Sequence, residues 1–102
     1  MNNLIIGIDP GSRFTGYGII ADENSQQHCI AYGRVVVKGH STAERLFHIY
    51  TEISQIITTH QPHEFAIETV FFHKNAQSAL KLVQARGAAL FAAAAQGLPV
   101  AE

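Results

Sequence analysis

Apolar residues fall in short runs over the first third of the chain and at helical spacing in the remainder. Three early runs, rich in residues that favour strands, are Leu4–Asp9, Gly16–Ala21 and His28–Val37. The polar cluster Asp22–Ser25 predicts a turn between the second and third runs, and Gly33 predicts a bulge or close packing within the third. Because short links of this kind join antiparallel strands, the pattern predicts a three-stranded antiparallel meander.

A helix is predicted to begin after Ser41, because Glu44, three residues later, completes a capping box. The residues that follow recur at helical spacing and form one apolar face: Leu46, Ile49, Tyr50, Ile53, Ile56 and Ile57. Pro62 ends this helix. The next apolar run, Phe65–Glu68, is typical of a fourth strand. Since a crossover helix leads into it, we expect it to pair in parallel with another strand.

A second helix is predicted from an N-cap at Asn75 to Gly97. Its later half, Ala85–Ala95, is apolar nearly all round, which predicts burial on more than one side. Pro99–Glu102 is typical of the opening of a fifth strand. We therefore expect residues 1–102 to form a single α/β domain with helices packed on a mixed sheet. The domain is expected to be incomplete, truncated at its fifth strand, and to be the front portion of a longer one.

Composition narrows the possible functions without selecting one. Of the 102 residues, 47% are hydrophobic and 15% charged, which is typical of a globular protein and not of a disordered tail. The net charge of −1 provides no overall positive field toward nucleic acid or lipid, although it allows a local basic edge. The apolar neighbours of the single cysteine, Cys29, predict a buried thiol. A cytoplasmic protein without membrane contact is expected, because the sequence shows neither a signal-peptide pattern nor an apolar run of about 20 residues.

Two carboxylates occupy corresponding positions at the ends of predicted strands. Asp9 ends the first strand directly before the turn formed by Pro10 and Gly11, and Glu68 ends the fourth. If these strands are neighbours, about 4.8 Å apart, the two acids can bind one divalent metal ion. The backbone at Gly11 and the hydroxyl of Ser12 could then contact a phosphate. The alternatives are a turn-forming aspartate, a surface glutamate and a loop that serves turn geometry alone.

Several sequence blocks, in this order along the chain, resemble the RuvC family of bacterial Holliday-junction resolvases. They cover nearly the whole chain and are Gly7–Arg13, Thr15–Gly18, Ala66–Glu68, Lys74–Ala76, Ser78–Leu82 and Gln84–Gly87. The glycine-and-acid loop occurs in other families as well, so the resemblance depends on the blocks taken together.

The resemblance implies a ribonuclease H-like nuclease domain in a homodimer formed through the second helix, with Mg²⁺, or alternatively Mn²⁺, as cofactor. Such an enzyme nicks two opposed strands of a four-way DNA junction in recombination and repair, leaving 5′-phosphates and 3′-hydroxyls. The branch-migration proteins RuvA and RuvB are its implied partners. Asp9 and Glu68 match the first two of the family's four catalytic acids. Because the other two lie beyond residue 102, we expect the chain to be inactive alone.

Candidate DNA contacts lie around the start of the second helix. Phe71 matches the family's aromatic residue that pushes against bases near the cut strand, a role consistent with wedge insertion into bent DNA. Lys74 and Lys81 are candidate phosphate contacts, and Arg86 is a weaker one. The alternative for Phe71 is a core aromatic, and for the three basic residues a solvated helix face.

The sequence also raises two alternative functions and the question of a zinc site. The glycine-acid loop also resembles the first phosphate loop of the actin, heat-shock-chaperone and sugar-kinase superfamily, which suggests a nucleotide-binding module. A non-catalytic, dimerising fragment is the second alternative, because the apolar second helix favours association. A zinc site is not expected, since the six histidines are scattered; His60 and His63 alone lie close, with Pro62 between them.

Overall fold

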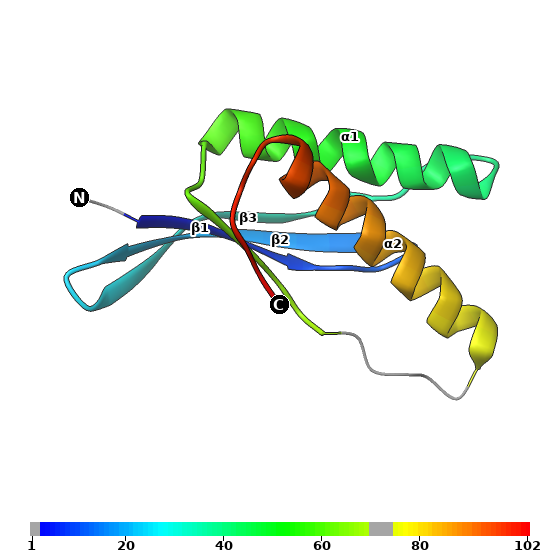
Figure 1. Cartoon of the computed structure of the whole chain (residues 1–102), viewed down its shortest axis with the longest axis horizontal. Coiled ribbons are helices and arrows are strands. Elements are labelled where there is room, and N and C mark those ends of the chain that lie inside the picture. The colour runs from blue at the N-terminus through cyan, green and yellow to red at the C-terminus, as the bar shows by residue number, and fades with distance from the viewer. Residues whose placement is uncertain (1–2, 70–74) are drawn as a thin grey trace.

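The computed structural model describes residues 3–69 and 75–102, and the part of the chain that it describes forms five strands and two helices (Figure 1). In chain order these are β1 (Asn3–Asp9), β2 (Phe14–Glu23), β3 (Gln26–Val36), α1 (Thr42–His60), β4 (Glu64–Ile67), α2 (Ala76–Ala95) and β5 (Val100–Ala101).

All five strands belong to one sheet, in the order β3-β2-β1-β4-β5. The first three form the predicted antiparallel meander, and β4 pairs with β1 in parallel, as expected after a crossover helix. The fifth strand adds to the sheet by pairing in parallel with β4. Gly33 serves close packing, because the ring of Tyr17 lies over it; the register shift in β3 lies opposite Ile19 and Ile20 instead.

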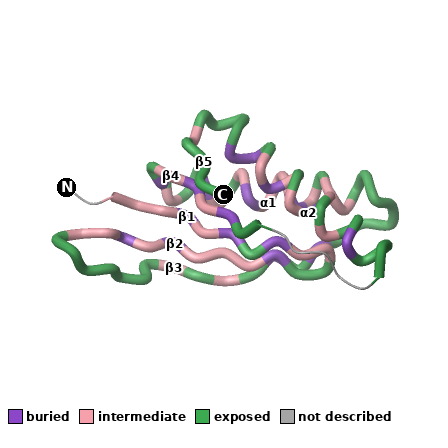
Figure 2. Tube along the Cα trace, turned by 60° about the horizontal axis from the view of Figure 1, so that its bottom comes forward, coloured by how far each residue is buried: buried purple, intermediate pink, exposed green. Residues whose placement is uncertain are grey.

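The core lies between one face of the sheet and the two helices. Alternate residues of the central strands point toward it, among them Ile6 and Ile8 of β1 and Phe65 and Ile67 of β4. Figure 2 shows the helices on the same side of the sheet, with the buried segments between the layers. No described element covers the opposite face, which we call the open face.

The first helix begins and ends as its sequence predicts. The Ser41 hydroxyl accepts a hydrogen bond from the backbone N–H of Glu44 (3.1 Å), and the Glu44 carboxylate accepts one from the N–H of His40 (2.9 Å). At the other end, Gln61 adopts a left-handed conformation with φ of 49° and donates to the carbonyl of Ile57. Pro62 follows directly, so the helix cannot continue.

The second helix is capped by Asn75, as predicted, but its burial is less than its composition suggests. Its buried residues are alanines that share one face: Ala79, Ala85, Ala89, Ala92 and Ala93. The opposite face is open to solvent, and Phe91 there is 64% exposed. The prediction that Ala85–Ala95 is buried on more than one side is therefore wrong for the single chain. Neither described helix is long and apolar enough to cross a bilayer.

Cys29 is exposed on β3, so the prediction of a buried thiol is also wrong. The tips of β2 and β3 extend beyond the helices as a two-stranded ribbon, visible at the left of Figure 1. Residues 26–30 lie on this ribbon and all are exposed. Apolar neighbours do not produce burial there, because β3 is the edge strand and no described helix covers its tip.

Candidate active site

The backbone brings Asp9 and Glu68 to the same edge and the same face of the sheet. Ile8 of β1 pairs with Ile67 of β4; Asp9 is the last residue of β1, and Glu68 directly follows β4. Because both isoleucines are almost fully buried against the helices, at 3% and 4% exposure, the side chains that follow them point to the open face. Both carboxylates are exposed there. The predicted convergence of the two acids thus has a direct basis in the strand register.

The two acids line one depression on the open face, with a volume of about 570 Å³. Its floor is a row of small residues at equivalent register positions across four strands: Gly18, Gly7, Ala66 and Ala101. A methyl group built on Gly7 or Gly18 would meet no other atom within 4 Å, so the space above the backbone is open. Small residues therefore leave room against the sheet beside the two carboxylates.

The loop after Asp9 is held tightly by contacts with the start of β2. The buried hydroxyl of Thr15 donates to the carbonyl of Gly11 (2.9 Å) and accepts from its N–H (3.3 Å). A Cβ at Gly11 would lie 2.1 Å from the carbonyl oxygen of Phe14. Only glycine fits this approach, so the loop enters the site in one defined shape.

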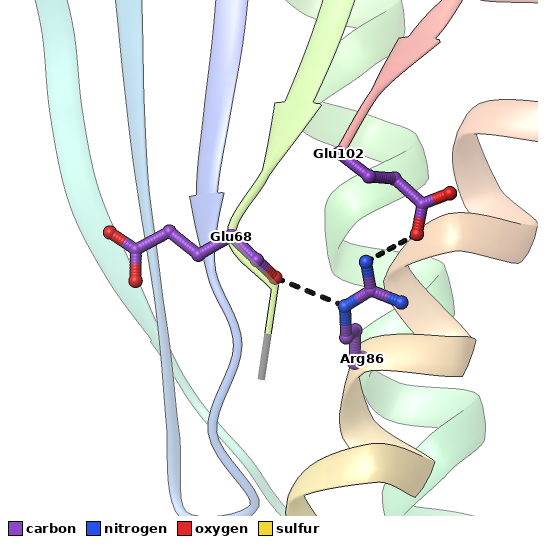
Figure 3. A network of polar contacts seen from close by, with 3 residues as sticks. All are labelled: Glu68, Arg86 and Glu102. Atoms are coloured by element: carbon purple, nitrogen blue, oxygen red, sulfur yellow. Dashed lines mark hydrogen bonds and ion pairs between the residues drawn. The ribbon is translucent and has the colours of Figure 1, made fainter. Parts of the chain in front are cut away.

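The end of β4 is tied to the rest of the fold by Arg86 (Figure 3). Its Nε donates to the main-chain carbonyl of Glu68 (3.0 Å), and its Nη2 forms an ion pair with Glu102, directly after β5. The Glu68 side chain points to the side opposite Arg86 in Figure 3, so its carboxylate stays available. Arg86 is only 17% exposed; it belongs neither to a solvated helix face nor to a free phosphate-binding surface.

The remaining predicted residues divide into two groups. Gly11 and Ser12 are half-buried in the loop after β1, and Lys81 is exposed on α2, where it lines a second cavity together with Ser12. Phe71 and Lys74 lie outside the described residues. None of these three residues lines the depression that holds the acids: Gly11 lies in the loop that follows Asp9, and Ser12 and Lys81 line the second cavity.

The donor set fits a hard divalent cation. The two exposed carboxylates on neighbouring strands offer oxygen ligands, which Mg²⁺ prefers and binds together with several waters. Glu102 lines the same depression but pairs with Arg86, and residues 3–69 and 75–102 hold no group of three or more acids, histidines or cysteines placed to share a metal ion. Further coordination positions are left for water and for phosphate oxygens.

A mixed sheet with this strand order, helices on one face, and acids at the ends of two central parallel strands defines a ribonuclease H-like fold. A comparison with protein-family models matches residues 5–102 to "Crossover junction endodeoxyribonuclease RuvC". The chain belongs to the RuvC family. The nucleotide-binding alternative is not favoured by this match.

Individual relatives agree with this assignment. Crossover junction endodeoxyribonuclease RuvC of Coxiella burnetii (strain Dugway 5J108-111) is 59% identical over 99 residues, which is 97% of this chain and 58% of the relative. The protein of the same name from Shewanella frigidimarina is 52% identical over 97% of this chain and 57% of its own length. Among solved structures, T. thermophilus RuvC in complex with Holliday junction substrate matches with a TM-score of 0.85 and 27% identity, over 96% of this chain and 62% of that one. The chain thus spans somewhat more than half the length of these relatives.

Proposed function

We propose that this chain is the front part of a Holliday-junction resolvase, an endonuclease that hydrolyses phosphodiester bonds in two opposed strands of a four-way DNA junction. The observation that supports it most directly is the placement of Asp9 and Glu68 side by side on the open face of a RuvC-family domain. The T. thermophilus relative was solved with a Holliday junction substrate, which supports the same kind of ligand here.

Asp9 and Glu68 are the proposed ligands of Mg²⁺, with Mn²⁺ as the alternative. When bound, the cation would supply Lewis-acid stabilisation of the charge that develops on the phosphate oxygens and would help to activate water. The chain contributes two fixed carboxylates, a floor of small residues that admits the DNA backbone, and an Arg86 contact that holds the end of β4. The backbone at Gly11 and the hydroxyl of Ser12 would orient a phosphate close to Asp9.

Further DNA contacts are proposed around the start of α2. Lys81 would bind a backbone phosphate, and Lys74 another. Phe71 would press against bases near the cut strand. The roles of Lys74 and Phe71 remain predictions from the sequence.

A homodimer formed through α2 is proposed as the assembly. The outward face of this helix exposes Leu80, Val83 and Phe91, which recur at spacings that form one stripe. The ring of Phe91 also packs at a tilt against that of Tyr50 of α1, 5.3 Å between ring centroids, so the apolar surface continues across both helices. Exposed apolar surface of this kind is typical of protein interfaces. RuvA and RuvB are proposed as further partners on the family resemblance alone.

Residues 1–102 alone are proposed to be inactive, because the resemblance places two more catalytic acids beyond them. The function is therefore best tested in a chimera in which the chain is continued by the C-terminal remainder of the Coxiella burnetii relative. In this chimera, Asp9→Asn should reduce Mg²⁺-dependent cleavage of a labelled four-way junction by about 100-fold or more, since metal stabilisation is worth several kcal/mol. Junction binding should be largely retained.

Asp22→Asn provides the matched control. It makes the same chemical change on β2. Gly16 of β2 lies opposite Asp9, and Asp22 is six residues further along β2, about 20 Å away. Its cleavage rate should equal that of the unmodified chimera. If Asp9→Asn cleaves as fast as Asp22→Asn, Asp9 is not a metal ligand of the reaction and the proposal fails.

A further inference from the structure

A second cavity, of about 430 Å³, lies between the loop after β1, the first turns of α1 and the first half of α2. Three cations line it: Arg13 from the loop, Arg45 from α1 and Lys81 from α2. These are half of the six lysines and arginines in the described part of the chain. None of the residues that line it is Asp or Glu. We call this cavity the basic pocket.

The charges of the basic pocket are not neutralised by the protein around them. Among the described residues, none of the three cations forms an ion pair with a carboxylate. Hydroxyl groups of Ser12, Ser41 and other residues line the same cavity. In a chain with a net charge of −1, unpaired cations gathered around one concavity favour an anionic ligand.

The pocket is also held in place by the fold. The Arg45 Nη2 donates to the carbonyl of Ser12 (2.7 Å), and the carbonyl of Arg13 accepts from the N–H of Val37 (3.0 Å). The loop is thereby fixed to α1 on one side and to the end of β3 on the other. The guanidinium of Arg45 carries five N–H groups, so its bonds to carbonyls leave others for a phosphate oxygen.

We propose that the basic pocket binds a backbone phosphate of the DNA strand whose neighbouring phosphate reaches Asp9 and Glu68. Ser12 is the third residue after Asp9, a span of at most about 11 Å, so the two phosphates would be close neighbours on one strand. This inference rests on the proposed function and extends it. Lys81 is already a candidate phosphate contact. The inference assigns Arg13 and Arg45 to the same phosphate, so that the three cations form one site and are not separate solvated charges.

Two measurements on the 102-residue chain test the site. In the first, inorganic phosphate is titrated to about 20 mM while amide resonances are followed by NMR, which detects a dissociation constant of about 1–10 mM. In the second, fluorescence anisotropy measures the affinity for a labelled four-way junction at several salt concentrations. Arg13→Gln and Lys81→Gln are compared with Lys38→Gln, which removes the same charge from an exposed residue that lines a different cavity.

We expect phosphate to shift the amides of Ser12, Arg13 and Lys81 in the unmodified chain and not in the two pocket variants. Each pocket variant should bind the junction about 3–10-fold more weakly and lower the slope of log K against log salt by about 0.9. Lys38→Gln should change the affinity less than about 2-fold, because Lys38 does not line the basic pocket and its exposed charge is screened by salt.

The possible failures are separable. Absence of any phosphate shift in the pocket overturns the site, whatever the DNA result. Equal loss of junction affinity in all three variants, or none in the pocket variants, overturns the assignment to a DNA phosphate while the proposed function stands. If the unmodified chain does not bind the junction, the DNA assignment falls and a phosphate shift supports a pocket for phosphate alone, while the proposed function is decided by cleavage in the chimera.

Discussion

Gly11 is the position at which a single methyl group should disturb the candidate site most. A Cβ added there would lie 2.1 Å from the carbonyl oxygen of Phe14 and 3.3 Å from its carbonyl carbon. Both are main-chain atoms of β2, so neither can move aside as a flexible side chain would. Relief of the contact requires the loop to shift by about 1 Å, a displacement of the kind that over-packing produces at a cost of about 1–3 kcal/mol.

The shift would also strain the two hydrogen bonds between Gly11 and the hydroxyl of Thr15. Thr15 is fully buried, so a hydroxyl that loses these partners has no water to replace them, which costs about 1–3 kcal/mol. Because a small movement weakens these bonds without breaking both, we expect Gly11→Ala to lower the free energy of unfolding by about 2–4 kcal/mol. With a urea slope of about 1–1.5 kcal/mol/M, the unfolding midpoint should fall by about 1.3–4 M.

Gly18→Ala is the control for this prediction. It adds the same methyl group to β2, but nothing lies within 4 Å of the added atom. Since glycine in a strand interior is less favourable than alanine by about 0.5–1 kcal/mol, this variant should be as stable as the unmodified chain or slightly more so. Urea unfolding followed by circular dichroism measures both. Equal midpoints for Gly11→Ala and the unmodified chain would refute the steric reasoning, and equal losses in both variants would assign the effect to β2 itself.

Two other predictions concern single side chains. Arg86→Gln should lower the free energy of unfolding by about 1–2 kcal/mol and weaken Mn²⁺ binding at Asp9 and Glu68, because the carbonyl of Glu68 loses its charged donor. Urea unfolding measures the first effect and calorimetric titration of Mn²⁺ the second. An unchanged Mn²⁺ affinity would show that Arg86 only stabilises the fold. Cys29 should react with a thiol reagent in the folded chain nearly as fast as in urea, because it is exposed; protection by more than about 100-fold would contradict its position on the ribbon.

Much of the fold follows from signals that act within a few residues. The cap of α1 needs only Ser41 and Glu44, which lie within one four-residue segment. Pro62 ends the helix because proline has no backbone N–H to donate. The parallel position of β4 follows from the crossover helix that leads into it. For the same reason the convergence of Asp9 and Glu68 was predictable, because each acid ends an apolar strand and the two strands are neighbours.

The parts that sequence reasoning missed depend on contacts between distant segments. Arg86 reaches Glu68 and Glu102 because β5 adds to the sheet beside β4, and no local pattern around Arg86 indicates that neighbour. The exposure of Cys29 depends on β3 being the edge strand and extending past the helices. The face of α2 that contains Phe91 is apolar yet open, since composition alone does not tell a face buried within the chain from one that a second molecule would cover.

The acids and the unpaired cations of the candidate site lie in two separate places, and the loop between β1 and β2 joins them. The acids lie on the open face of the sheet, whereas the unpaired cations line the basic pocket beside the helices. The loop that follows Asp9 carries Ser12 and Arg13, so a displacement of Gly11 should weaken both cation and phosphate binding. Loss of Arg86, by contrast, affects the ends of β4 and β5 and should leave the basic pocket unchanged. Gly11→Ala and Arg86→Gln therefore distinguish one coupled site from two independent sites: in a coupled site, Gly11→Ala weakens the binding of both the cation and the phosphate.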